Sequence, residues 1–157
     1  MPGTATVPAL LAYSSCCAFM GAAGVFTFSA HPGGIEAGPL AYTLWFNKMF
    51  PKVAALQAAM AVVSTGGAVT QALRGGGGGG GGGGQRGLWL TGAGLMAFML
   101  PWTLRAIMPI NRAIMAAAEQ GRAAPLETLK AWGPVHNVRT AVAAVAAAIM
   151  SYALYTM

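Results

Sequence analysis

The segment Thr140–Met157 reads TAVAAVAAAIMSYALYTM, which is 18 consecutive residues without a charged side chain. Asp, Glu, Lys and Arg are absent from three further segments of similar or greater length, residues 2–30, 53–73 and 87–104. A helix that packs on a soluble core needs a polar face toward water, and these segments cannot supply a charged one. The hydrocarbon core of a bilayer is about 30 Å thick, so a spanning helix needs about 20 mostly apolar residues. The sequence therefore predicts four membrane spans.

The composition supports the same interpretation. Only 12 of the 157 residues are charged, nine basic and three acidic, which is 8% of the chain; an ordinary soluble domain has about 25%. Hydrophobic residues make up 56%, and the mean hydropathy is +0.60. These values exclude a soluble globular enzyme, a DNA-binding module and a disordered chain. We predict an all-α fold, a single integral membrane four-helix bundle over residues 1–157 with spans at about 8–30, 51–73, 87–108 and 134–157.

Glycine and proline predict where the helices begin and end. The sequence His31-Pro32-Gly33-Gly34 is a strong helix breaker and is expected to end the first span. Pro51 is suited to the first position of the second helix. The glycine run of residues 75–84 predicts a flexible linker without chemistry of its own. In the third connector, residues 113–120 are expected to form a helix that ends at Gly121, and Pro125 is expected to open a second short helix.

Basic residues are concentrated near two of the three connectors. Connector one (residues 31–50), connector three (109–133) and their flanks hold Lys48, Lys52, Arg105, Arg112, Arg122, Lys130 and Arg139, whereas connector two has only Arg74 and Arg86. Because cytoplasmic loops carry the excess of Lys and Arg, connectors one and three are expected in the cytosol and both termini on the other side. The lysines are typical headgroup anchors.

The sharpest polar pattern lies at the start of the fourth span. Trp132, His136 and Arg139 are spaced by four and three residues, so they share one helix face if the helix runs through Pro134. If Pro134 instead begins the helix, Trp132 turns away from the other two. A guanidinium beside an imidazole favours the neutral ring, which can accept a proton, and it can stabilise an anion formed by deprotonation. The alternative interpretation is a snorkelling arginine beside an interfacial histidine.

Other polar residues lie near the same ends of the spans, namely His31, Glu36, Asn47, Asn111 and Asn137. A histidine before Pro-Gly-Gly also fits a simple turn, a glutamate in a connector is typically solvated, and asparagine commonly caps helices. Two histidines and a carboxylate could bind non-haem iron, yet His31, Glu36 and His136 have no close ligand spacing. We therefore predict no metal site.

Two adjacent cysteines, Cys16 and Cys17, lie in the first apolar segment. A quinone-coupled disulfide enzyme would need a C-x-x-C pair, and the chain has none. Both cysteines are expected to be small buried hydrophobes.

These motifs together resemble a known family. The sequence Pro109-Ile110-Asn111, the pattern Trp132-x-x-x-His136-x-x-Arg139 and the pair Asn47-Lys48 are similar to those of small four-helix membrane proteins that include the fungal anthrone oxygenases. The resemblance covers most of the chain except the glycine run. It implies a monooxygenase of secondary metabolism that oxidises a polyketide anthrone to an anthraquinone with O₂, without flavin or metal. It also implies a multi-pass protein of the endoplasmic reticulum.

The resemblance also implies roles for the residues. His136 is the expected general base, with His31 as a substitute or relay, and Arg139 stabilises the enolate oxygen. Asn47 and Asn111 are expected to hydrogen-bond substrate oxygens, and Trp132 to stack on the rings. Asn137 is a further candidate for substrate binding.

Two alternatives stay open at this point. One is an oxygenase of the same fold that depends on iron or copper, and the other is a non-catalytic scaffold or carrier for an aromatic small molecule. A transporter is disfavoured because no acidic residue lies inside a span. The expected partners are an anthrone and the lipid bilayer, not nucleic acid, and small residues in the spans allow a homo-oligomer.

Overall fold

The computed structural model describes residues 5–74 and 82–157, and regular structure in these two ranges is entirely helical, without a strand. The elements in chain order are α1 (Val7–Val25), η1 (Phe26–Ala30), α2 (His31–Glu36), α3 (Pro39–Arg74), α4 (Gly82–Trp102), η3 (Thr103–Ile107), α5 (Met108–Glu119) and α6 (Leu126–Tyr155), where η marks a π-helical segment. Four helical stretches are long and apolar enough to cross a membrane: Val7–Glu36, Pro39–Arg74, Gly83–Glu119 and Leu126–Tyr155. The predicted all-α, four-span fold is confirmed.

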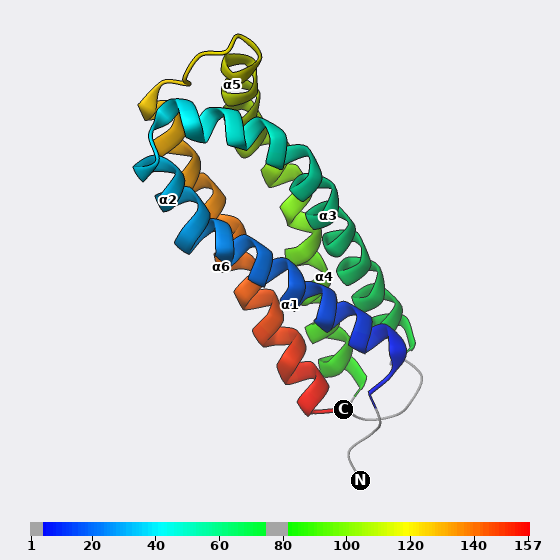
Figure 1. The fold of residues 1–157 in the computed structure, drawn as a ribbon. Coiled ribbons are helices and arrows are strands. Elements are labelled where there is room, and N and C mark those ends of the chain that lie inside the picture. The colour runs from blue at the N-terminus through cyan, green and yellow to red at the C-terminus, as the bar shows by residue number, and fades with distance from the viewer. Residues whose placement is uncertain (1–4, 75–81) are drawn as a thin grey trace.

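The four long helices form an elongated bundle (Figure 1). Both α1 and α4 pack against α3 and α6, so α3 and α6 face each other diagonally across the bundle axis. The first turn of α1 and the last turn of α6 lie at one end, while α2 and α5 lie at the other.

Two clusters of buried residues divide the core along this axis. We call them the terminal core and the inner core. The terminal core includes Phe19, Trp89 and Met150 together with many alanines. The inner core, nearer to α2 and α5, consists of Tyr42, Phe46, Ile107, Ile114, Ala117, Ala124, Leu129 and Trp132.

The expected end of the first helix at residues 31–34 is wrong. The helical path continues through η1 into α2 and ends after Glu36, where Gly38 has a φ of +98°. Pro32 lies inside this continuous helical path, where its missing N–H removes one intrahelical hydrogen bond. Gly38 is therefore the turning point, because its positive φ suits glycine and few other residues.

The second helix also begins earlier than expected. α3 starts at Pro39, directly after Gly38, and runs through Pro51. Two prolines were available for the first position, and the one that follows the turn glycine takes it. Interior prolines are tolerated in membrane helices because neighbouring groups compensate the lost hydrogen bond. Connector one is consequently a short turn rather than a 20-residue segment.

The third connector is mostly as predicted. α5 spans Met108–Glu119, the turn after it contains Gly121 with a φ of +65°, and Pro125 precedes the first residue of α6. The expectation of a separate short helix is wrong, because α6 continues without a break through Pro134 to Tyr155. Thr43 ties this connector to α3: its hydroxyl accepts from the backbone N–H of Ala124 at 3.0 Å.

The glycine run is only partly described. Residues 75–81, and with them most of the linker predicted over 75–84, lie outside the described residues. The helix α4 already begins at Gly82, so the last glycines of the run are helical. The assignment of bundle ends to sides of the membrane stays a prediction.

Two π-helical segments interrupt the long helices in the inner half of the bundle. η1 precedes Pro32, and η3 lies between Pro101 and Pro109. π-helical segments widen a helix by one residue per turn and occur frequently at functional sites. Here they carry Phe26 and Ile107, which both face the pocket described next.

Candidate active site

The helix α6 presents three predicted site residues on one buried face. Because the helix runs through Pro134, Trp132, His136 and Arg139 point into the bundle, with exposed fractions of 4%, 1% and 8%. The rings of Trp132 and His136 stack with centroids 4.3 Å apart and an angle of 17° between their planes. Of the two arrangements that the sequence left open, the structure has the one that keeps all three together.

Trp132 is held in place from two sides. Its indole Nε1–H donates to Oδ1 of Asn111, on α5, at 2.8 Å, and the asparagine is completely buried. Phe46 and Phe26 approach it edge-on, with centroid distances of 5.8 and 6.3 Å. The indole plane therefore fixes the plane of the stacked His136 imidazole.

His31 belongs to the same cluster but lies outside the pocket. Its Nδ1 makes a 2.8 Å hydrogen bond with the hydroxyl of Tyr42, and its ring centroid is 5.3 Å from that of Trp132. The other edge of the ring rests on Gly133, where a Cβ would come within 2.6 Å of Nε2. His31 is thus enclosed by α3 and α6, and it contacts Trp132 rather than the pocket.

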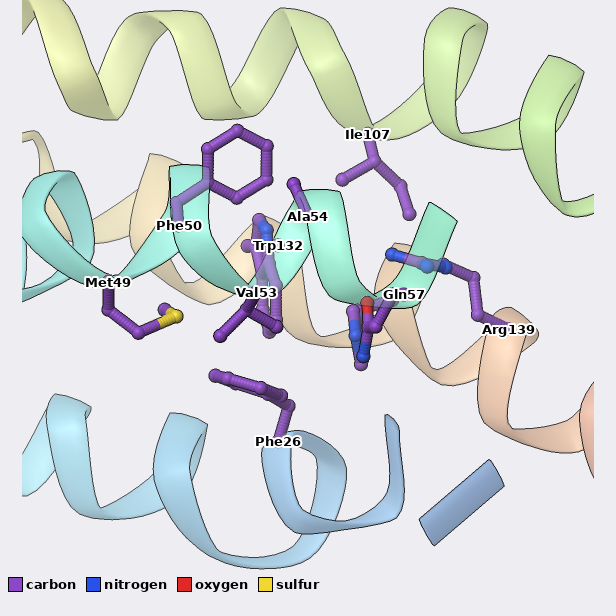
Figure 2. Close-up of a pocket in the computed structure, with 10 residues that line it drawn as sticks. Phe26, Met49, Phe50, Val53, Ala54, Gln57, Ile107, Trp132 and Arg139 are labelled. Atoms are coloured by element: carbon purple, nitrogen blue, oxygen red, sulfur yellow. The ribbon is translucent and has the colours of Figure 1, made fainter. Parts of the chain in front are cut away.

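A partly open pocket lies between the helices beside Phe26, Trp132 and Arg139 (Figure 2). All four spans contribute to its lining, which consists of Phe26, Met49, Phe50, Val53, Ala54, Gln57, Ile107, Trp132, His136 and Arg139. The walls are apolar and aromatic apart from Gln57, His136 and Arg139, so a flat apolar ligand with an oxygen atom at one position fits its chemistry.

Three polar atoms of the pocket lining are buried without a hydrogen-bond partner among the described residues: Nδ1 of His136, Nε of Arg139 and Nε2 of Gln57. A buried polar group without a partner costs about 1–3 kcal/mol. The Arg139 guanidinium lies over the ring of Phe19, with Cζ 5.0 Å from the centroid, and the three glutamates of the chain are all exposed. The site therefore presents an unpaired imidazole nitrogen and two unpaired N–H donors to a ligand.

Three predicted substrate-binding residues do not line this pocket. Asn137 is exposed, because it follows His136 and successive residues of a helix point about 100° apart. Asn47 is half-buried and lies one turn before Pro51 on α3. Asn111 also stays outside the lining, and its observed role is to hold Trp132.

The residues of the metal alternative do not come together either. Over residues 5–74 and 82–157, no group of three His, Cys, Asp or Glu side chains is placed to hold a metal ion. Glu36, the proposed carboxylate ligand, is exposed.

The sequence analysis missed Gln57 and Tyr42. A carboxamide in the otherwise apolar stretch 53–63 was a usable signal for Gln57, since polar groups at membrane depth are expensive. Tyr42 had no such signal, because it was assigned to a connector and its partner His31 was assigned to a turn. The helical position of Tyr42 followed only from the start of α3 at Pro39.

These features define a multi-pass membrane protein of four helices with a small-molecule pocket between the helices and an imidazole and a guanidinium in the pocket wall. A family model described as anthrone oxygenase matches residues 39–149, from the start of α3 almost to the end of α6. The match covers more than two thirds of the chain, and the chain belongs to the anthrone oxygenase family. It is therefore an oxygenase that acts on anthrones. The matched segment contains Gln57, Asn111, Trp132, His136 and Arg139. Comparison with curated proteins and with solved structures finds no significant match.

Proposed function

We propose that this protein oxidises a polyketide anthrone to an anthraquinone by base-assisted deprotonation and direct electron transfer to O₂, without a bound cofactor. The observation that carries the proposal is the pairing, in one apolar pocket, of a buried imidazole with a free nitrogen and a buried guanidinium without a carboxylate partner.

His136 is the general base. With the ring proton on Nε2, its unpaired Nδ1 is an acceptor at the pocket wall. The anthrone C–H opposite the carbonyl is acidified because its removal makes the central ring aromatic. A positioned base contributes typically 10²–10⁴-fold to a rate. The stacked Trp132 keeps the imidazole in a fixed plane, so that it meets the substrate in one orientation.

Arg139 stabilises the anion that this step forms. When the methylene proton moves to His136, the negative charge develops on the carbonyl oxygen of the anthrone. A guanidinium in an apolar, water-poor site interacts strongly with such a charge. Since the acidic residues of the chain are exposed, the substrate anion does not compete with a carboxylate of the protein for Arg139.

The remaining steps balance with O₂ as the oxidant. The electron-rich anion passes one electron to O₂, which gives a carbon radical and superoxide, and these combine to a hydroperoxide anion that takes the proton from the imidazolium. Removal of the second methylene hydrogen and cleavage of the O–O bond release water and leave the quinone carbonyl. One anthrone and one O₂ thus give one anthraquinone and one water.

The other predicted residues act around this centre. His31 and Asn111 support Trp132 from outside the pocket, one through ring contact and one through the 2.8 Å hydrogen bond. We place the protein in the endoplasmic reticulum membrane of a fungal polyketide pathway. In this proposal the end of the bundle that carries α2 and α5 faces the cytosol, because most of the basic residues are at that end.

The proposal is tested by mixing purified protein with anthrone under nitrogen, admitting O₂ and following quinone absorbance, with metal content measured on the same sample. Rapid O₂-dependent quinone formation by metal-free protein, well above the rate in buffer, supports the proposal. Activity that rises and falls with bound iron or copper would favour the metal-dependent alternative. Anthrone binding without acceleration would leave a scaffold or carrier.

A further inference from the structure

Gln57 is a polar residue of the pocket lining that has no role in the proposed mechanism. It lies on α3, on the face that also presents Met49, Phe50, Val53 and Ala54, because these positions recur at helical spacing. Its side chain is only 2% exposed. α3 therefore directs a carboxamide into the pocket from the side opposite α6, which supplies Arg139 (Figure 2).

The other buried polar side chains of α3 all have partners within the protein. Tyr42 bonds His31, the hydroxyl of Thr43 donates to Pro39 O, that of Ser64 donates to Ala12 O, and Gln71 bonds Thr6. In Gln57, by contrast, Nε2 has no partner among the described residues. Since an unpaired buried donor destabilises the fold, a pocket ligand is the natural source of its acceptor.

We propose that Gln57 is the second donor to the substrate oxygen, so that the enolate is held between Arg139 Nε–H from α6 and Gln57 Nε2–H from α3. The inference rests on the proposed function and adds a residue to it. An enolate oxygen accepts more than one hydrogen bond, and a neutral amide adds a donor without a second positive charge in the apolar core. Loss of one such donor typically reduces kcat by about 10²–10³-fold.

The test uses two matched substitutions in one helix, Gln57→Met and Gln71→Met. Methionine has the length of glutamine and no amide, so each variant removes one carboxamide with little change in volume. Gln71 lies 14 residues further along, about 21 Å at the helical rise, and its partner Thr6 is the N-cap of α1. The first readout is kcat for anthrone oxidation. The second is measured under nitrogen: it is the pH at which half of the bound anthrone is ionised, as judged from the absorbance of the anthrone anion.

Gln57→Met is expected to lower kcat about 10²-fold and to require a higher pH for half-ionisation of the bound anthrone. Its melting temperature should be equal to or above that of the wild type, because an unpaired buried donor has been removed. Gln71→Met should keep both readouts and melt at a lower temperature. Gln57→Asn keeps an amide but withdraws it by one methylene, so it should fall between Gln57→Met and the wild type in kcat.

Two results would overturn the inference while the proposed function stands: a wild-type kcat in Gln57→Met, or a loss of kcat without any change in ionisation of the bound anthrone. If the wild-type protein itself neither ionises nor oxidises anthrone, the proposed function fails, and this inference fails with it.

Discussion

The terminal core and the inner core of this bundle are built from different side chains. Ten of the 16 buried residues of the terminal core are alanines, whereas only two of the eight in the inner core are. At the terminal end, backbones come close: a Cβ on Gly67 of α3 would lie 2.8 Å from the carbonyl oxygen of Pro8. Small residues permit this close packing in membrane helices.

The inner core is instead built around large aromatic rings. Tyr42, Phe46 and Trp132 fill the space between α3 and α6, and π-helical segments and interior prolines fall in the same half of the bundle. Rings of this size do not close the axis completely, and the pocket with its unpaired polar atoms remains. We infer that the terminal half mainly stabilises the fold and that the inner half carries the proposed chemistry.

The largest expected effect is on the chemistry of the site. His136→Ala should lower kcat by about 10²–10⁴-fold, because the general base is lost. The matched control in the terminal half is Ser64→Ala, which removes a 2.9 Å hydrogen bond to Ala12 O and should leave kcat unchanged. Both are measured as initial rates of quinone formation in detergent, with helical content checked by circular dichroism. Wild-type turnover in the His136 variant would remove histidine from the mechanism.

The next prediction compares two substitutions of Arg139, one that removes its charge and one that keeps the charge but changes the geometry of the donor group. Arg139→Met should reduce kcat by about 10²–10³-fold, since it removes a donor to the developing oxyanion. Arg139→Lys keeps the charge but not the planar fork, so it should lie between the wild type and the methionine variant. Steady-state kinetics of the two variants tests this order. Equal kcat values for all three proteins would show that residue 139 does not act on the transition state.

The sequence was sufficient for the spans and for the face of α6. Charge-free stretches require a membrane, and the spacing of Trp132, His136 and Arg139 places them together on any continuous helix. The sequence was not sufficient where a proline has two possible positions. Pro32 fits either the end of a helix or the interior of a continuous one, and Pro51 fits either a helix start or an interior position. The contacts of Gln57 and His31 depend on how α3 packs against α6, and a single sequence does not contain that information.

A third prediction tests the close packing of the terminal half. Gly67→Ala should destabilise the fold by about 1–3 kcal/mol, because the new methyl group meets backbone atoms of Pro8 and Ala12 that cannot move aside. Gly92→Ala should cost less, since its methyl group meets the flexible side chain of Met150. Thermal unfolding in detergent measures both. A larger loss in Gly92→Ala than in Gly67→Ala would contradict the packing described here.

The smallest expected effect compares a tryptophan from each half. Trp132→Phe leaves Asn111 Oδ1 without its indole donor and loosens the ring that orients His136, so we expect a loss of about tenfold in kcat. Trp89 is equally buried, but its Nε1 has no partner in the described chain, and Trp89→Phe should leave kcat unchanged. The kcat values of both variants, normalised to the amount of folded protein, are compared with that of the wild type. A similar loss in both variants would mean that the effect comes from packing alone.

In the proposed mechanism, His136 removes a proton from anthrone before O₂ takes part. This step can be followed by incubating anthrone with the protein in D₂O under nitrogen and measuring deuterium uptake at the methylene carbon by mass spectrometry. Wild-type protein should exchange this position much faster than buffer, and His136→Ala should not. Equal exchange in wild-type and variant proteins, while the wild type still forms quinone when O₂ is admitted, would contradict it.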